Sequence, residues 1–347
     1  MNLSNATLTQ VSVHLVGNKG NGEEFFVSKQ PVELSENDLY TLKDSFLSKF
    51  SLDMDRYSFF NATSLNYNEV YNFCLDTLAE SNTFHANSVN IAKHLYESST
   101  HPKIKAGDLY VCYFEHCIVG GAEVDAIGIF KTETKSNFLE VDVNLNDISI
   151  GVHEGVEMTK FDKACLVFPT NAEAGFDVLI YDNRNKGDEA VFWRETFLSV
   201  LPQATEYFQT NQFMTLTKQF IAEQVPMEFE VSKTDQIDLL NKSVEYFRAN
   251  ESFDKKQFVS KVFDGTGMGN SFQRFEDDFA VTNDLEFPEQ FGISTKAVKK
   301  QAKVFKSVLK LDKNFHVYIH GDKSLIEKGF DEKTGKNFYK IYFDEEE

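Results

Sequence analysis

The sequence predicts an α+β fold in two domains, and three observations support this prediction. The chain has 347 residues, which is enough for roughly two hydrophobic cores. Residues 1–185 contain strand-like segments joined by short turns, a pattern that favours antiparallel pairing. Residues 186–347 are mainly helical in pattern and return to strands near the carboxyl end. We therefore expect an N-terminal domain (1–185) that contains an antiparallel sheet. A mainly helical C-terminal domain (186–347) follows, closed by a small antiparallel sheet and ending in an acidic tail.

The N-terminal domain begins with a strand and two helices. Residues 7–16 alternate polar and apolar side chains, as a half-buried strand does. Four apolar residues then recur at helical spacing after Ser35, a suitable N-cap. These residues are Leu39, Leu42, Phe46 and Phe50. Residues 87–99 predict another helix, which closes before His101 because the next residue is a proline.

Two hairpins are predicted next. Residues 108–116 and 122–130 flank the turn sequence "IVGG", and residues 164–168 and 176–181 flank "PTNAEAG". Connections this short favour antiparallel strands over crossovers. The polar run "DNRNKGD" (182–188) contains many turn formers and is the predicted domain boundary.

The C-terminal domain is predicted to hold several helices before its closing sheet. Residues 188–201 predict the first helix, with Asp188 as its cap, and Ser232 caps a later one. Apolar residues at helical spacing mark the others. They are Leu216 and Phe220, then Ile237, Leu240, Val244 and Phe247, then Phe258 and Val262. Residues 315–321 and 336–343 alternate and predict strands.

The composition excludes several classes of protein. With 41% hydrophobic residues, 34 Phe and a single Trp, the chain is globular, not disordered, and its core relies on Phe. The start has no basic segment followed by an apolar one, and no window approaches 18 consecutive apolar residues, so we expect a cytoplasmic protein without a membrane segment. Four cysteines in so long a chain indicate reduced, buried thiols. They are Cys74, Cys112, Cys117 and Cys165.

One stretch opposes the charge of the whole chain. The net charge is -19, yet residues 294–313 carry seven Lys and one Asp, which leaves -25 on all other residues. On a helical wheel at about 100° per residue, Val298, Ala302, Phe305 and Leu309 share one face. Six lysines occupy an opposite arc of roughly 120°. They are Lys296, Lys299, Lys300, Lys303, Lys306 and Lys310.

This predicted lysine helix, capped by Ser294, has two interpretations. Lysine is a good helix former, so the arc is compatible with an ordinary solvated face. However, six like-charge pairs at spacings of three and four residues oppose the helix by about 1 to 3 kcal/mol. No acid occurs among the 22 residues from Gln290 to Leu311, where the average of the chain predicts about three. An anionic partner would relieve this repulsion: a nucleic-acid backbone, a phosphorylated ligand or an acidic protein surface.

Motifs for catalysis and metal binding are weak. "DGTGMGN" (264–270) follows a helical pattern and lacks the Lys-Ser/Thr ending of a P-loop, so we interpret it as a turn. Asp125, Glu133 and Lys135 have the order of a metal-dependent nuclease site, but they fall on or just past one strand, where the carboxylates do not converge. Cys112 and Cys117 lack a second pair that could complete a zinc site. We expect no cofactor, no metal site and no catalytic residues.

The chain resembles the bacterial 37-kDa nucleoid-associated protein family over nearly its whole length. The resemblance rests on five stretches. They are "HPKIKAGDLYVCYFE" (101–115), "VDAIGIFKTE" (124–133), "DNRNKGDEAVFWRETFL" (182–198), "FGISTKAVKKQAKVFKSVLKLDKNFHVYIHG" (291–321) and "GFDEKTGKNFYKIYF" (329–343). It implies a cytoplasmic, DNA-associated protein of the nucleoid without enzymatic activity, and it supplies no set of DNA-contacting residues.

These observations predict a non-enzymatic DNA-binding protein of the nucleoid. The six lysines would contact phosphates with little sequence preference, and neutralising five or six phosphates would give a salt slope of about -4.5 to -5.4 on duplex DNA. The alternative is a protein-interaction module recruited through a DNA-bound partner, which the -25 charge of the remaining residues favours. A metal-dependent nuclease is a distant third. The oligomeric state stays open, and a homodimer is compatible with the sequence.

Overall fold

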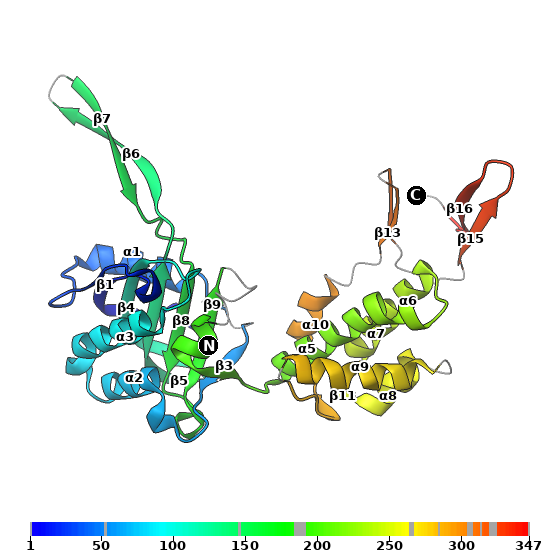
Figure 1. Ribbon diagram of the computed structural model, residues 1–347, viewed down its shortest axis with the longest axis horizontal. Helices are drawn as coiled ribbons and strands as arrows, with labels where there is room; N and C mark the ends of the chain where they lie inside the picture. Colours follow the sequence, from blue (N-terminus) through cyan, green and yellow to red (C-terminus); the bar gives the residue numbers. More distant parts are fainter. Residues whose placement is uncertain are drawn as a thin grey trace. The chain divides into compact units, whose positions relative to one another are not determined.

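The computed structural model describes most of the chain and divides it into two compact units, Met1–Gln203 and Ala204–Glu347. The described residues are 2–51, 54–144, 147–183, 192–263, 267–283, 285–303, 308–312, 314–318 and 325–345. Strands dominate the first unit and helices the second (Figure 1), which confirms the predicted α+β class. The predicted boundary at residues 185 and 186 lies outside the described residues, and the contacts of the chain divide it after Gln203.

The first unit is built on an eight-stranded antiparallel sheet. Its strand order is β10-β3-β9-β8-β5-β4-β1-β2. The strands are β1 (Thr7–Val16), β2 (Phe25–Val27), β3 (Arg56–Phe59), β4 (Gly107–Val119), β5 (Ala122–Thr132), β8 (Lys163–Phe168), β9 (Asp177–Asp182) and β10 (Val200–Pro202). The predicted strand at residues 7–16 and both predicted hairpins, β4–β5 and β8–β9, are confirmed. Positive φ angles at Gly120 and Gly121 form the tight turn between β4 and β5.

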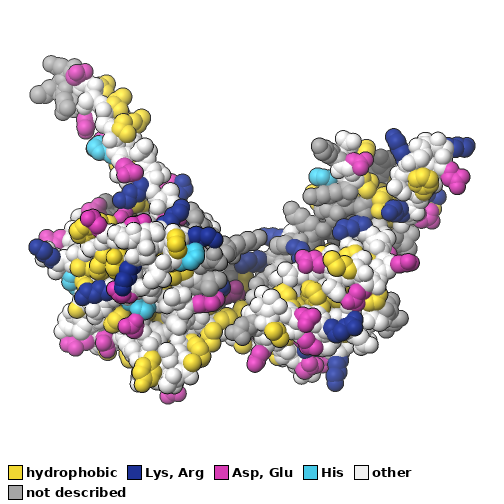
Figure 2. Space-filling model, viewed as in Figure 1, with side chains coloured by type: hydrophobic (Ala, Val, Ile, Leu, Met, Phe, Trp, Pro, Cys, Tyr) yellow, Lys and Arg dark blue, Asp and Glu magenta, His cyan; other side chains and the backbone are white. Residues whose placement is uncertain are grey.

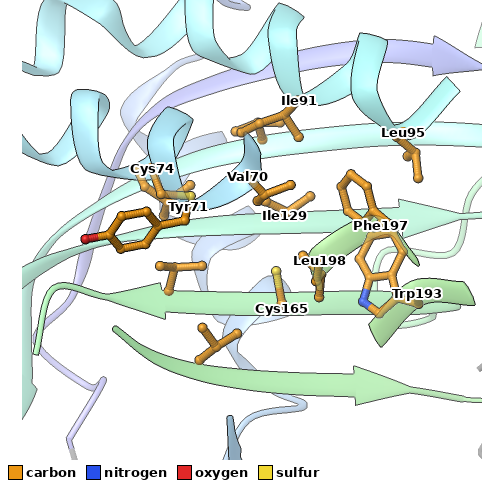
Figure 3. Packing of buried hydrophobic residues seen from close by; sticks show 14 of the residues in the cluster. Val70, Tyr71, Cys74, Ile91, Leu95, Ile129, Cys165, Trp193, Phe197 and Leu198 are labelled. Carbon is orange, nitrogen blue, oxygen red and sulfur yellow. The ribbon is translucent and has the colours of Figure 1, made fainter. Parts of the chain in front are cut away.

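Helices cover both faces of this sheet, so its central strands are buried on both sides. On one face, α2 (Glu69–Ala79), α3 (Phe84–Ser98) and the π-helix Phe192–Leu198 pack on β4, β5 and β8. Figure 3 shows this packing, with Phe197 between Leu95 and Trp193 and with Val70, Tyr71 and Cys74 of α2 on the same side of the strands. On the other face, α1 (Glu36–Leu47) contributes Phe46, which stacks on Phe130 with ring centroids 4.4 Å apart. The cores are aromatic, as the composition predicts.

The first unit departs from the prediction at the end of one helix, and it contains a hairpin that was not predicted. The helix predicted at residues 188–201 is wrong at its end, because Val200 is buried and pairs with Phe59 of β3 in the sheet. Only Phe192–Leu198 is described as helical, and residues 184–191 lie outside the described residues. A separate hairpin, β6 (Ser136–Asn144) and β7 (Asp147–Gly155), was not predicted.

The second unit packs several helices around a core rich in phenylalanine. Phe213 lies at its centre, with ring centroids 4.2 Å from Phe253 and 5.4 Å from Phe258. The helices are α5 (Glu206–Gln219), the π-helix Phe220–Gln224, α6 (Val225–Glu228), α7 (Lys233–Ala249), α8 (Lys255–Val262), α9 (Met268–Asn283) and α10 (Thr295–Ala302). The predicted helices around Leu216, Ile237 and Phe258 are confirmed.

Within the described residues, the strands of the second unit form three small two-stranded antiparallel sheets, two of them near the carboxyl end. They are β11 (Ser252–Asp254) with β12 (Gln290–Gly292), β13 (Val308–Leu311) with β14 (Phe315–Tyr318), and β15 (Ile326–Asp331) with β16 (Lys336–Ile341). The last two pairs meet at Ile237 of α7, which is buried against Leu311, Val317, Ile326 and Tyr339. One helix residue therefore anchors both C-terminal hairpins.

Candidate nucleic-acid interface

The lysine helix α10 is held at its start by specific backbone bonds. The Ser294 side chain accepts a hydrogen bond from the backbone N–H of Ala297, as an N-cap does, which confirms this predicted cap. The backbone N–H of Ser294 donates to Thr210 Oγ1 of α5 at 3.0 Å. Just before it, the buried Ile293 donates its N–H to the Glu251 carbonyl at 2.8 Å. These bonds fix the direction in which the helix leaves the core.

The two sides of α10 differ in chemistry and in burial. Ala297 is fully buried and Val298 is only 4% exposed, and Val298 belongs to the phenylalanine-rich core. Four lysines lie exposed along the rest of the helix and at its C-cap. They are Lys296, Lys299, Lys300 and Lys303. The predicted amphipathic pattern is therefore confirmed over residues 295–303.

The described hydrogen bonds from side chains of α10 reach uncharged side chains of α5, although the Glu206 carboxylate at the start of α5 lies beside Gly292, just before the helix. Gln301 bonds to Asn211 and donates to Thr215 Oγ1 at 3.3 Å, and Lys300 Nζ donates to the hydroxyl of Tyr207 at 3.1 Å. The same ammonium lies 5.6 Å from the Tyr207 ring centroid, a cation–π distance that leaves its charge intact. Within the described parts of the chain, Lys299 and Lys303 form no ion pair with a carboxylate. This edge of the unit is cationic.

The helix is shorter than the sequence pattern predicted. It ends at Ala302 with Lys303 as its C-cap, where the prediction extended it to about Lys310. Lys310 instead lies on β13, with its Cα opposite His316 of β14, and Lys306 lies outside the described residues. Two physical effects favour the strand: Leu311 and Val317 pack on Ile237, and a longer helix would bring more lysines within one turn of each other. The six lysines therefore do not share one helical face.

Charge is distributed unevenly between the two units. Met1–Gln203 contains 15 Lys and Arg against 29 Asp and Glu, a net charge of -14. Ala204–Glu347 contains 20 against 25, a net charge of -5, although the last four residues of the chain are all acidic. A polyanion is repelled less by the second unit, which carries the lysine helix.

The weak catalytic and metal motifs of the sequence do not assemble into a site. Asp125 accepts a hydrogen bond from the Tyr113 hydroxyl at 2.7 Å, and Glu133 forms a buried ion pair with Lys131 at 2.8 Å. Lys135 lies 3.7 Å from Asp108 instead. In the described residues, no group of three or more His, Cys, Asp or Glu side chains could hold a metal ion. The four cysteines are buried and unpaired, as predicted, and burial raises the pKa of each thiol.

Sequence reasoning missed the residues of α5 that support the lysine helix. Tyr207, Asn211 and Thr215 follow one another at a spacing of four residues, which places uncharged polar groups along one side of α5. A stripe of this kind on one helix, next to an acid-free stretch elsewhere, is a usable signal. The pairing of the two segments was not predictable, because about 90 residues separate them.

A family model described as "Nucleoid-associated protein YejK" matches residues 12–343, nearly the whole chain. A search of curated proteins found no match. No helix in the described parts of the chain is both long and apolar enough to span a membrane.

Proposed function

The chain belongs to the 37-kDa nucleoid-associated protein family, and from this premise we propose that it contacts DNA directly, through phosphates, at the lysine helix α10. The observation that supports the proposal most strongly is the cationic edge formed by Lys296, Lys299, Lys300 and Lys303 beside the uncharged side chains of α5. Lys306 and Lys310 follow closely in the sequence and extend the proposed site. Phosphate contacts position a protein without reading bases, so binding is largely independent of sequence.

The size of this edge suits a phosphate backbone. From Lys296 to Lys303 the helix rises about 10 Å, a length over which duplex DNA carries about six phosphate charges. Because the affinity comes from released counterions, it falls as salt rises. Lysine side chains are long and solvated, so they reach different phosphates without a fixed register.

Salt-dependent binding of a triple variant tests this proposal. Lys299→Gln, Lys300→Gln and Lys303→Gln in one protein remove three charges but keep good helix formers at exposed positions. On duplex DNA, the slope of log K against log salt should shrink by about 2.7 for each engaged α10. Fluorescence anisotropy titrations from low to physiological salt measure this slope.

The control replaces three other exposed lysines of the same unit. Lys256→Gln, Lys333→Gln and Lys336→Gln change the net charge by the same amount, so the overall field of the protein changes equally. This control should keep the wild-type slope. If the salt slope decreases by the same amount in both triple variants, the binding depends only on the net charge of the protein, and α10 is not the site.

A second candidate function is recruitment to the nucleoid through a DNA-bound protein. The net charge of -14 on the first unit favours it, because that charge repels DNA at long range. In this case the purified wild-type protein fails to bind naked DNA at physiological salt, and the lysine edge meets an acidic protein surface instead.

Neither function requires a chemical step, and we propose that the protein is not an enzyme. The contacts of Asp125, Glu133 and Lys135 support this proposal. Each of these side chains contacts a different residue, so the three do not converge on one metal ion. Supercoiled plasmid incubated with the protein and Mg²⁺ should stay intact, and nicking or linearisation would contradict the proposal.

A further inference from the structure

The hairpin β6–β7, here called the arm, is a two-stranded ribbon outside the main sheet. Its strands Ser136–Asn144 and Asp147–Gly155 pair in unbroken antiparallel register, from Ser136 opposite Gly155 to Asn144 opposite Asp147. Nine residues per strand extend about 30 Å. Figure 1 shows the arm reaching beyond the eight-stranded sheet of its unit. Because the arm lies outside the main sheet, the sheet does not cover either of its two faces.

One face of the arm is aliphatic. The register places three pairs on it, Leu139 with Val152, Val141 with Ile150, and Val143 with Ile148. These six side chains are between 60% and 77% exposed, which is unusual for so many neighbouring aliphatic residues. Figure 2 shows hydrophobic side chains along one edge of the arm. None of the described arm residues belongs to a hydrophobic core cluster.

The opposite face of the arm is mainly polar and acidic, and its one aromatic residue, Phe138, stacks on His153 with ring centroids 5.6 Å apart. It carries Glu140, Asp142 and Asp147, and His153 Nε2 lies 2.9 Å from Glu140 Oε2. Residues 136–155 contain four Asp and Glu and no Lys or Arg. This charge repels nucleic acid and anionic membranes, so the aliphatic face is unsuited to either. The chemistry of the arm points to a protein surface.

The exposed apolar area of the arm can be compared with the area that a stable protein interface buries. With about 100 Å² of apolar area per aliphatic side chain and two-thirds of it exposed, the face presents roughly 400 Å². Two such faces together provide roughly 800 Å², close to the apolar share of a standard interface of about 1,600 Å². An isolated two-stranded hairpin is also only marginally stable in water, so the arm itself gains from being covered.

We propose that the aliphatic face of the arm binds the same face of a second copy of this chain. A two-fold axis brings identical aliphatic rows together as two packed ribbons about 10 Å apart, the usual spacing of stacked sheets. Its three aliphatic pairs are Val, Ile and Leu, which interdigitate without needing a deep pocket, and the polar pair Asn137 with Glu154 lies at the base of the same face. In this arrangement the acidic faces point outward from both ribbons, so their charges stay in water and far from each other.

Sedimentation of the full chain tests this proposal without DNA. Wild type should sediment at twice the chain mass of 39.7 kDa over roughly a hundred-fold range of concentration. Val141→Asp with Ile150→Asp should sediment as a monomer with unchanged thermal unfolding of the first unit, because both residues lie outside the cores. Wild-type monomers, or dimers that survive the double substitution, would overturn the proposal.

Single cysteines show which face is covered. Ile150→Cys lies at the middle of the aliphatic face and should form a disulfide between copies under mild oxidation, whereas Ser149→Cys on the opposite face should not. The native cysteines are buried and give little background. Equal cross-linking at both positions would indicate random collisions and overturn the proposal. A lipid surface is the other occupant to test. If wild-type monomers co-sediment with neutral phosphatidylcholine vesicles and the Val141→Asp, Ile150→Asp variant does not, a membrane covers the face and the proposal is overturned.

Discussion

Asn68 joins three segments of the first unit with a single buried side chain. Its Oδ1 accepts the backbone N–H of Tyr71 at 2.9 Å, which caps α2. Its Nδ2 donates to the carbonyls of Phe60, Leu198 and Ser199 at 3.0 to 3.1 Å. The amide thus connects the start of α2 to the ends of β3 and of the π-helix. Few other side chains offer an acceptor and two donors in this space.

Replacing Asn68 separates its two roles. Asn68→Asp keeps the capping acceptor but loses the donors and turns a carboxylate toward three carbonyl oxygens, so we expect a loss of about 3 kcal/mol or more in the free energy of unfolding. Asn68→Ala loses both roles without the repulsion, and we expect about 2 to 3 kcal/mol. Urea unfolding measures both. Ser35→Ala, which removes only the exposed cap of α1, serves as the control at about 1 kcal/mol. Asn68→Asp being milder than Asn68→Ala would contradict this account.

His14 shows a buried ring whose hydrogen bonds require the neutral form. Its Nδ1 accepts the backbone N–H of Ser28 at 3.2 Å, so the ring proton lies on Nε2, which faces Ser88 Oγ at 3.1 Å. Ser88 in turn donates to the His85 carbonyl at 2.7 Å. Burial, followed by the nearby His85, lowers the pKa of His14 from 6.5 to about 4.

This lowered pKa makes the folded state sensitive to acid. Between pH 6.5 and about 4 the unfolded chain binds a proton at His14 that the folded chain does not, so stability falls as pH falls through this window. We expect His14 to account for roughly 2 kcal/mol of that loss. In urea unfolding series across the window, His14→Gln should be less stable at neutral pH but less dependent on pH. His116→Gln, at an exposed site beside Glu123, should keep the wild-type dependence on the acid side. Parallel curves for wild type and His14→Gln would exclude this role for His14.

Residues with local partners were predictable, and residues with distant partners were not. Ser35 and Ser232 were identified as caps because their partners lie three residues away. Asn68 bonds to Leu198 across 130 residues and His14 to Ser88 across 74, so no local pattern points to these contacts. The exposure of Lys299 follows from helical periodicity, whereas the bond between Gln301 and Asn211 of α5 follows only from the tertiary fold.

At the scale of elements, periodicity predicted the starts of helices better than their ends. The sequence after Lys303 still fits a helical wheel, yet residues 308–311 form β13 because a hairpin buries Leu311 and Val317 on Ile237. Short β-branched stretches suit both patterns, and tertiary packing decides between them. The arm was missed for a related reason: its alternation is clear, but a hairpin without a core to cover is not an expected part of a domain.

The role of Ile237 as a shared anchor predicts a local effect. In the described cluster, Leu311, Val317, Ile326 and Tyr339 pack against the buried side chain of Ile237. Ile237→Ala removes most of this side chain, so both C-terminal hairpins should detach more often. Limited proteolysis should then cut within residues 308–343 several times faster, while the core around Phe213 stays protected. Ile237→Val keeps most of the contact and should resemble wild type. Faster cleavage throughout Ala204–Glu347 would show instead that Ile237 supports the whole unit.

At the scale of the whole molecule, each unit has its own buried cores and its own charge. The clusters that contain Phe130 and Ile129 lie within Met1–Gln203, and the cluster around Phe213 lies within Ala204–Glu347. The change from strand to helix patterns predicted two domains with a boundary at residues 185 and 186, which lie outside the described residues. The division after Gln203 was not visible in the sequence, because β10 pairs with β3, more than 140 residues earlier. A unit that buries its own core is expected to fold alone.

Separate expression of the two units locates the DNA contact. Ala204–Glu347 should fold and bind duplex DNA in a salt-dependent manner that Lys299→Gln, Lys300→Gln and Lys303→Gln remove, because it carries the cationic edge of α10. Met1–Gln203, with a net charge of -14, should fold and fail to bind at the same salt. Circular dichroism melts confirm folding of each fragment before anisotropy titrations compare their affinities. If only Met1–Gln203 binds DNA, the contact lies in the first unit. If neither fragment binds DNA at low salt although Ala204–Glu347 is folded, recruitment by a DNA-bound protein is the remaining explanation.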